Sequence, residues 1–317
     1  MEKPVRFPTT LLEAVRYFGD LDVAHKFATM IRWPNGVACP RMGCGSADVH
    51  YISTRRMWRC NDCKRQFSTK VGTIFEDSPI GYDKWLPAMW MLASDRNGIS
   101  SCELARALGV TQKTAWFMLH RIRHAMKSGT FQKLHGEVEA DETYIGARLF
   151  RANNAAKRRL EARNIGTNPR GGQSHLTAVL GMKQRGGPVR AMVVPNTRTF
   201  ALNLRLRDHV EKGSTLYTDA WNAYEAARFR FVHKVVNHSV EYVSGEIHTN
   251  SIESFWSVLK RTIKGTYICP RPKHLDRYLD EQVWRFNNRE DTDGKRLTKV
   301  LKQADGARLT YQELINE

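Results

Sequence analysis

Two kinds of side chain alternate at the helical period in the stretch HTNSIESFWSVLKR, residues 248–261. Residues three and four positions apart lie on the same side of a helix, so this stretch has two faces. The apolar face consists of Ile252, Phe255, Trp256, Leu259 and Ile263, and the polar face carries Asn250, Glu253, Ser257, Lys260 and Lys264. We therefore predict an amphipathic helix that packs its aromatic side against the protein, with Asn250 or Ser251 as its N-terminal cap.

The polar face of this helix presents a carboxamide, a carboxylate and an ammonium in line, at Asn250, Glu253 and Lys260. A carboxylate with a lysine two turns further on suits a metal-dependent site that acts on phosphodiesters. The same residues also fit an ordinary surface helix, because pairs of opposite charge are common on exposed helices. The rest of the chain has to decide between these two interpretations.

The composition favours a polyanionic partner. The chain has 317 residues, a formal net charge of +18 and a pI near 9.8, and nucleic acid is the commonest partner of such a protein. A merely basic cytosolic protein is the alternative. We expect no signal peptide, because residues 1–10 lack an apolar region, and no membrane span, because no run approaches about 18 apolar residues. Six cysteines in such a chain favour reduced thiols or a metal site over disulfides.

Two close pairs of cysteines, Cys39 with Cys44 and Cys60 with Cys63, predict a zinc ribbon. Such pairs suit one structural zinc ion held in a tetrahedron of four thiolates. The module is too small to fold on its own core, so the metal would supply its stability. The first pair is wider than the usual two-residue gap, and a redox pair at Cys60 and Cys63 or unrelated thiols are the alternatives. Basic residues around the ribbon suggest that it touches DNA: Arg55, Arg56, Arg59, Lys64 and Arg65.

The next segment follows the pattern of a helix-turn-helix. A first helix ends at Gly109, in the tight turn, and Thr111 caps a second helix that would read DNA. The exposed residues of the second helix can meet bases and phosphates: Gln112, Lys113, Arg121 and Arg123. A plain helical hairpin without a role in DNA binding is the alternative. Cys102, within this hairpin, is expected to be a small packing residue.

From Gly136 the pattern changes to strands, and we place a domain boundary near residues 128–134. The order expected from there is strand-strand-strand-helix-strand-helix-strand-helix. Its strands are predicted over 137–146, 175–182, 189–195, 214–220 and 234–237, with a helix over 199–210 and a short one around Tyr224. Acids lie in the first strand, at the end of the fourth and on the last helix, at Asp141, Asp219 and Glu253. Along the first strand, Glu139 shares a face with Asp141, while Glu142 points to the other face.

The chain thus divides into five segments. They are a helical lead-in (1–35), the zinc ribbon (36–75), the helix-turn-helix region (76–130), a catalytic domain (135–270) and a C-terminal helical extension (271–317). The lead-in is expected to bury Leu11, Leu12, Val15, Phe18 and Phe27. Residues 148–172 read as a polar, arginine-rich loop that could grip a phosphate backbone beside the site.

Three motifs in this order resemble those of ribonuclease H-like DDE transposases and integrases: EADETYIG at 139–146, YTDAWNAY at 217–224 and HTNSIESFWSVLK at 248–260. They are most similar to one group of bacterial insertion-sequence transposases with an N-terminal zinc ribbon, the family numbered fifteen-ninety-five. The likeness extends from about Thr10 to Arg289 and includes CNDCKRQFS at 60–68 and YLDEQVWRFNNR at 278–289. It implies a mixed α/β chain with a ribonuclease H-like catalytic domain behind a zinc ribbon and a helix-turn-helix.

The resemblance also implies a chemistry, phosphodiester hydrolysis followed by strand transfer, with two Mg²⁺ or Mn²⁺ ions. Asp141 would bridge both ions, Asp219 would hold one and Glu253 the other. The group tolerates Asn or Glu as its third member, so the resemblance leaves both Asn250 and Glu253 as candidates. Charge favours Glu253 as the principal ligand, with Asn250 as a supporting one. Lys260 would meet a phosphate. Glu139 and Glu142 are expected to face solvent or to support the ligands.

The partners implied are double-stranded DNA, as the element's terminal repeats and as target, and further copies of the chain in a homodimer or higher assembly. The expected location is the bacterial cytoplasm, on the nucleoid. Two other functions stay open on the sequence. One is a DNA-binding regulator, derived from a transposase, that has lost catalysis. The other is a ribonuclease H-like nuclease without strand transfer.

Overall fold

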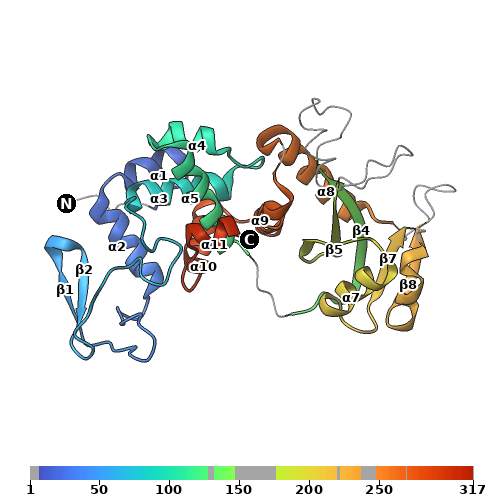
Figure 1. Cartoon of the computed structure of the whole chain (residues 1–317), viewed down its shortest axis with the longest axis horizontal. Helices are drawn as coiled ribbons and strands as arrows, with labels where there is room; N and C mark the ends of the chain where they lie inside the picture. Colours follow the sequence, from blue (N-terminus) through green and yellow to red (C-terminus); the bar gives the residue numbers. More distant parts are fainter. Residues whose placement is uncertain are drawn as a thin grey trace. The chain divides into compact units, whose positions relative to one another are not determined.

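The computed structural model describes residues 7–127, 132–146, 176–219, 222–236, 248–268 and 270–316. The chain forms two compact units (Figure 1), Met1–Ser128 with Asn288–Glu317, and Gly129–Asn287. The second unit is therefore an insertion in the sequence of the first. The arginine-rich segment 148–172 and Cys269 lie outside the described residues, as does part of the expected domain boundary. Within those residues, no helix has the length and apolarity needed to cross a bilayer.

The lead-in forms two capped helices, α1 (Leu11–Phe18) and α2 (Leu21–Arg32). Thr10 and Glu13 make a reciprocal capping box at α1, and the Asp20 carboxylate caps α2. The expectation of a buried Leu11, Leu12 and Val15 is wrong, because these three side chains are exposed. The face of α1 that packs inward carries Ala14 and Phe18 instead, and Phe27 of α2 is buried as expected.

The ribbon is a three-stranded antiparallel sheet of β1 (Val49–Ile52), β2 (Met57–Cys60) and β3 (Gln66–Phe67), with the short helix η1 (Ser53–Arg55) between the first two. Its register places Tyr51, Trp58 and Phe67 side by side on one face. The ring of His25 on α2 stacks on Trp58, with 5.4 Å between ring centroids. The ribbon is thus attached to the helices through an aromatic row.

The rest of this unit is helical. It comprises α3 (Tyr82–Ser94), α4 (Ser101–Leu108), α5 (Gln112–Ala125), α10 (Asp293–Gln303) and α11 (Tyr311–Asn316). Between α4 and α5 the chain turns at Gly109, whose left-handed backbone (φ 61°) suits a residue without a Cβ. α10 packs against α2, α3 and α5, so the C-terminal segment completes the core of the N-terminal unit.

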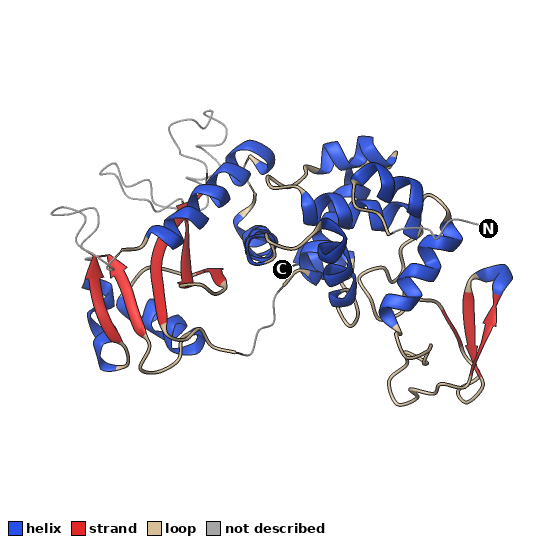
Figure 2. Cartoon of the chain, turned by 180° about the vertical axis from the view of Figure 1, so that it is seen from behind, coloured by secondary structure: helices blue, strands red, loops and turns tan. Residues whose placement is uncertain are grey.

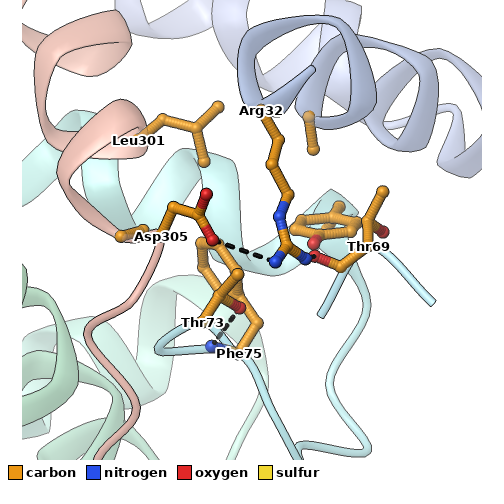
Figure 3. Close-up of a pocket in the computed structure, with 9 residues that line it drawn as sticks. Arg32, Thr69, Thr73, Phe75, Leu301 and Asp305 are labelled. Atoms are coloured by element: carbon orange, nitrogen blue, oxygen red, sulfur yellow. Dashed lines mark hydrogen bonds and ion pairs between the residues drawn. The ribbon is translucent and has the colours of Figure 1, made fainter. Parts of the chain in front are cut away.

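An ion pair joins the two parts of the chain that form this unit. Arg32, at the end of α2, lies 2.9 Å from Asp305 beyond α10, and its guanidinium also donates to the carbonyl of Thr69 at 2.7 Å (Figure 3). Burial lowers the pKa of Arg32, and the Asp305 charge opposes this effect. The pocket drawn in Figure 3 therefore surrounds the protein's own buried Arg32 guanidinium. Its role is structural, because this cation connects the two parts of the chain.

The inserted unit is built on a mixed five-stranded sheet in the order β6-β5-β4-β7-β8. Figure 2 shows its strands as red arrows with helices packed beside them. Its strands are β4 (Glu137–Ile145), β5 (Thr177–Gln184), β6 (Val189–Val193), β7 (Thr215–Asp219) and β8 (Val232–Val236). β4, β5 and β6 pair antiparallel, and β4, β7 and β8 pair parallel. The expected mixed α/β fold class is confirmed, and the elements follow the expected order.

Helices cover both faces of this sheet. α7 (Thr199–His209) and η3 (Asn222–Phe229) share a core with Val138, Ala140 and Leu180 on one face. α8 (Asn250–Thr262) and α9 (Leu275–Asn287) share a core with Ile145, Val179 and Val189 on the other. α8 continues into a π-helical turn (Ile263–Tyr267), and the 3-10 turn η5 (Pro272–His274) leads into α9. Because successive side chains of β4 point to opposite faces of the sheet, every second residue of β4 faces α8.

Candidate active site

Two acids lie level with each other on the neighbouring parallel strands at the centre of the sheet. The ladder between β4 and β7 ends where Glu139 pairs with Tyr217. Asp141 and Asp219 each follow two residues later, so both lie just beyond the last pair, and Asp219 is the last residue of β7. Ligands of open α/β sheets bind in this kind of position, where strands part at their carboxyl ends.

The third acid comes from α8. Glu253 lies in its first turn, and the charges of Glu253 and Asp219 both act on Asp141. Burial raises the pKa of Asp141 and these two charges raise it further, while hydrogen bonds from the backbone amide of Glu142 and the Trp256 indole oppose the rise. The structure thus brings together the three acids that the sequence singled out.

The three carboxylates are spread more widely than the ligands of one ion. Among the described residues, the only closely gathered set of metal-ligand side chains is a group of four cysteines in the ribbon. A site for two divalent ions about 4 Å apart needs carboxylates around both ions, and magnesium keeps several waters among its ligands. The hard oxygen donors, and the mutual repulsion that cations would relieve at Asp141, fit such a pair.

The polar face of α8 is exposed as the sequence predicts. Asn250, the first residue of the helix, is exposed, as are Glu253, Ser257, Lys260 and Lys264. The Thr249 hydroxyl donates to the Glu253 carboxylate at 3.3 Å, which supports the side chain from the residue before the helix. Asn250 and Glu253 are one turn apart and Lys260 lies two turns further on, so all three share the open side of the helix.

Glu139 caps α8, and this corrects the prediction that Asn250 or Ser251 does so. The Glu139 carboxylate, fully buried on β4, accepts from the backbone amides of Ser251 at 2.9 Å and Ile252 at 3.0 Å. Thr249 occupies the cap position without a side-chain cap bond. A carboxylate from a neighbouring strand thus satisfies the free amides and the positive end of the helix. Glu139 does not face solvent.

Arg185, in the turn after β5, neutralises the buried Glu139. Its Nε lies 3.0 Å from Glu139 Oε1, and its Nη2 donates to the carbonyl of His248 at 2.9 Å. The guanidinium lies 4.0 Å above the ring of Tyr217 on β7. This network joins β4, β5, β7 and the start of α8. Nothing in the sequence indicates this network beyond a turn-forming Arg185-Gly-Gly-Pro188 and a glutamate inside a strand.

Replacing Glu139 by alanine is expected to destabilise the inserted unit by about 2–4 kcal/mol, because it removes the buried partner of the half-buried Arg185 and the cap of α8. Glu139→Gln keeps an acceptor oxygen and should cost less. Urea unfolding followed by circular dichroism measures both. Glu225→Ala, at an exposed glutamate of η3, is the control and should shift stability by no more than about 0.5 kcal/mol. Equal midpoints for Glu139→Ala and Glu225→Ala would contradict the assigned role.

Glu142 lies on the opposite face of β4, where it supports a tyrosine. The hydroxyl of Tyr224, a fully buried residue of η3, donates to its carboxylate. Burial raises the pKa of Glu142 to about 7, and the charges of Asp141 and Asp219 add to this effect, while the Tyr224 bond opposes it. Glu142 thus ties η3, which follows β7, to the strand that carries Asp141.

The four ribbon cysteines form a metal-binding group. Cys39 and Cys63 have their sulfurs 3.8 Å apart, those of Cys44 and Cys60 are 3.6 Å apart, and all four lie within 4.8 Å of one another. Four sulfurs at about 2.3 Å from one zinc ion would be about 3.8 Å from each other, so the spacing fits a tetrahedral site. Backbone amides of Cys63 and Asp62 donate to Cys60 and lower its pKa to about 7. The donor set is consistent with a structural zinc ion.

The basic residues predicted to bind DNA fall into two groups. In the ribbon, Arg55, Arg59, Lys64 and Arg65 are exposed, whereas Arg56 forms an ion pair with Asp22 at 2.5 Å. In α5, Gln112 and Lys113 are exposed at the first turn. The expectation that Arg121 and Arg123 are exposed is wrong: they are 6% and 1% exposed.

The burial of these arginines follows from the packing of α5. Between Met118 and Arg123 every residue of this helix is buried, against α3, α4 and α10. Arg121 stacks on Phe117 and donates from Nε to the carbonyl of Leu309 at 3.1 Å. The exposed residues of α5, Gln112 and Lys113, therefore lie in its first turn. Cys102, expected to pack inside, is exposed on α4.

The mixed sheet carries acids on two neighbouring strands, β4 and β7, and a third acid lies on α8, which packs against one face of the sheet. Residues 133–287 match the ISXO2-like transposase domain, and residues 20–66 match the transposase zinc-ribbon domain. The chain belongs to this transposase family, the one numbered fifteen-ninety-five and indicated by its motifs.

Two relatives support this assignment. An uncharacterized protein in the transposable element ISH50 of Halobacterium salinarum is 31% identical over 247 residues, which cover 75% of this chain and 81% of the relative. An uncharacterized transposase-like protein of Haemophilus influenzae is 34% identical over 116 residues, or 36% of this chain and 91% of the relative.

Proposed function

We propose that this chain is a DDE-type DNA transposase that binds the ends of its element, cleaves them and joins them to target DNA. One observation carries the proposal: the fold brings Asp141, Asp219 and Glu253 together from β4, β7 and α8 so that their charges interact. Their positions lie more than thirty residues apart in sequence, and a regulator that only binds DNA has no need of them. The family assignment supports the same function.

Each side chain has a distinct role in this proposal. Asp141, at the centre, would contact both divalent ions. Asp219 would bind one ion and Glu253 the other, and Asn250 would offer a neutral oxygen. When bound, Mg²⁺ or Mn²⁺ would activate the attacking oxygen and stabilise the leaving oxygen. The exposed Lys260 would hold the neighbouring phosphate as a point charge. The site would first direct water to attack a phosphodiester at the element's end, which frees a 3′ hydroxyl. It would then direct this hydroxyl to attack a phosphodiester of the target DNA.

Charge and exposure support double-stranded DNA as the partner. The net charge is +18, and exposed cations occur on the ribbon, on the first turn of α5 and on α8. We assign terminal-repeat binding to the ribbon and to α4 and α5, acting as a helix-turn-helix. Since an element has two ends, we propose that a homodimer or higher assembly of the chain pairs them, in the cytoplasm on nucleoid DNA.

Incubation of the full chain with a labelled element end, Mg²⁺ and a target plasmid tests this function. The proposal requires labelled ends covalently joined to the plasmid. Nicked ends without joining would indicate a nuclease, and a mobility shift without cleavage would indicate a DNA-binding regulator. Asp141→Asn, run beside the wild type, controls for a contaminating nuclease.

We assign a phosphate contact to Lys113 and a base contact to Gln112, and these two roles lead to different expected results. Lys113→Ala should weaken binding to the element's ends for all sequences and reduce the slope of log K against log salt by about one, because one phosphate contact is lost. Gln112→Ala should leave this slope unchanged and relax the preference for the specific end. Fluorescence anisotropy over a salt titration measures both. If neither variant alters binding, end recognition lies in the ribbon and not in α5.

A further inference from the structure

The indole of Trp256 forms the contact between α8 and the central acid. Trp256 is 3% exposed, in the apolar core between α8 and the sheet. Its Nε1 donates a hydrogen bond to Asp141 Oδ2 at 2.9 Å. A buried indole N–H usually finds a partner, but here the partner is the carboxylate at the centre of the acid group. The apolar stripe of α8 therefore carries a polar atom aimed at the site.

Gly181 makes room for this indole. It lies on β5 directly opposite Asp141 in the antiparallel ladder. A Cβ at this position would lie 2.4 Å from Cζ2 and 2.5 Å from Cη2 of Trp256, and 2.9 Å from Cδ1 of Ile252. Distances this short are closer than real Cβ atoms approach. Any larger residue at position 181 would push the indole, and with it the helix, away from Asp141.

The strand and the helix are joined at two points whose spacings match. On β4, Glu139 and Asp141 are two residues apart, about 6.6 Å along a strand. On α8, the amides bound by Glu139 belong to Ser251 and Ile252, and the indole bound by Asp141 comes four to five residues later, about 6–7.5 Å along a helix. The three hydrogen bonds at these two points together hold α8 in one register on β4. This register places Glu253 of α8 beside Asp141 of β4.

We propose that Trp256 is a positioning residue for catalysis, whose indole N–H holds Asp141 Oδ2. Gly181 makes this contact possible because it leaves room for the indole ring. The proposal rests on the proposed function, because it assigns Asp141 to the binding of divalent ions. With Oδ2 engaged by the indole, the carboxylate cannot rotate freely, and Oδ1 is left to face both cations. Hydrogen bonds that orient a metal-binding carboxylate typically change metal affinity or activity by about 10–100-fold when they are removed.

Three variants separate this role from simple packing. Trp256→Phe keeps an aromatic ring but removes the N–H, and Gly181→Ala keeps the N–H but displaces the indole. Phe255→Leu is the control, because Phe255 is fully buried in the same core and makes no bond to Asp141. In element-end cleavage, the first two variants should raise the Mg²⁺ concentration for half-maximal rate about tenfold or more. Phe255→Leu should leave it unchanged.

The indole can also be observed without any activity. The full chain has eight tryptophans, so ¹⁵N-tryptophan labelling gives a short set of indole signals, and the signal missing from Trp256→Phe is that of Trp256. We expect this signal to shift when Mg²⁺ is added and when Asp141 is replaced by Asn. Gly181→Ala should move it toward the position of an indole without a carboxylate partner.

The two readouts distinguish the failure of this proposal from the failure of the proposed function. A Trp256 signal that responds to Mg²⁺ in a wild-type chain without cleavage activity would support the contact and contradict the transposase function. An active wild type whose Trp256 signal ignores both Mg²⁺ and Asp141→Asn would overturn the positioning role. So would equal Mg²⁺ requirements for Trp256→Phe and Phe255→Leu. If Trp256→Phe does not fold, the Mg²⁺ requirement of Gly181→Ala and the response of the wild-type Trp256 signal test the positioning role instead.

Discussion

Replacing Glu253 by glutamine is expected to abolish cleavage and joining of element ends, while replacing Asn250 by alanine leaves measurable activity. Both residues lie on the open side of α8, one turn apart, but it is the charge of Glu253 that acts on Asp141. An anionic oxygen neutralises a hard dication far better than a carboxamide does. Metal ions contribute several kcal/mol to such reactions, so the loss for Glu253→Gln should be about 10³-fold or more.

Single-turnover cleavage of a labelled end measures these rates, with Asp141→Asn and Asp219→Asn as inactive references. End binding by all four variants should equal that of the wild type, since the acids are assigned to chemistry and not to recognition. Mn²⁺ should partly restore Asn250→Ala. The reverse ranking, with Asn250→Ala inactive and Glu253→Gln active, would make Asn250 the third catalytic member and contradict the assignment.

Removing the metal from the four-cysteine group is expected to unfold the ribbon and leave the inserted unit folded. The ribbon's core is small and centres on Trp58, Phe67 and the cysteines themselves. Structural zinc contributes about 10–16 kcal/mol of apparent binding energy in small modules, far more than such a core supplies. Residues Gly129–Asn287 form a separate compact unit and should not respond.

Hydrogen exchange followed by mass spectrometry resolves this effect by segment. A strong chelator, or Cys63→Ser, should increase exchange over residues 36–75 and weaken binding to element ends. Cys102→Ser is the matched control, because Cys102 is exposed on α4 and outside the metal-binding group. Protein purified without chelator should contain one zinc ion per chain. Its absence, or an unchanged exchange pattern after chelation, would contradict the assignment.

Features encoded in local patterns could be predicted from the sequence. The helical period of residues 250–264 identified both faces of α8, and the cysteine spacing identified the metal-binding group. Acids at the end of one strand and within another, in a fixed order of elements, indicated where the site would form. These features can be predicted because each depends on residues close together in the chain, or on a topology with few alternatives.

Features that depend on distant partners could not be predicted. Glu139 caps α8 across more than one hundred residues, and Gly181 leaves room for Trp256 because of a ladder register that the sequence does not state. Arg121 and Arg123 look like surface residues, yet α5 is surrounded because the C-terminal α10 returns to pack on it. Leu11, Leu12 and Val15 fit a helical stripe equally well on either side of α1, and the inward side belongs to Ala14 and Phe18.

Anomalous diffraction from Mn²⁺ in crystals of the full chain bound to an element end tests the central claim most directly. The account predicts two manganese peaks about 4 Å apart, bounded by Asp141, Asp219 and Glu253, with the scissile phosphate beside them and the Trp256 indole on the outer oxygen of Asp141. Manganese bound to DNA away from these three carboxylates, with none among them, would contradict it.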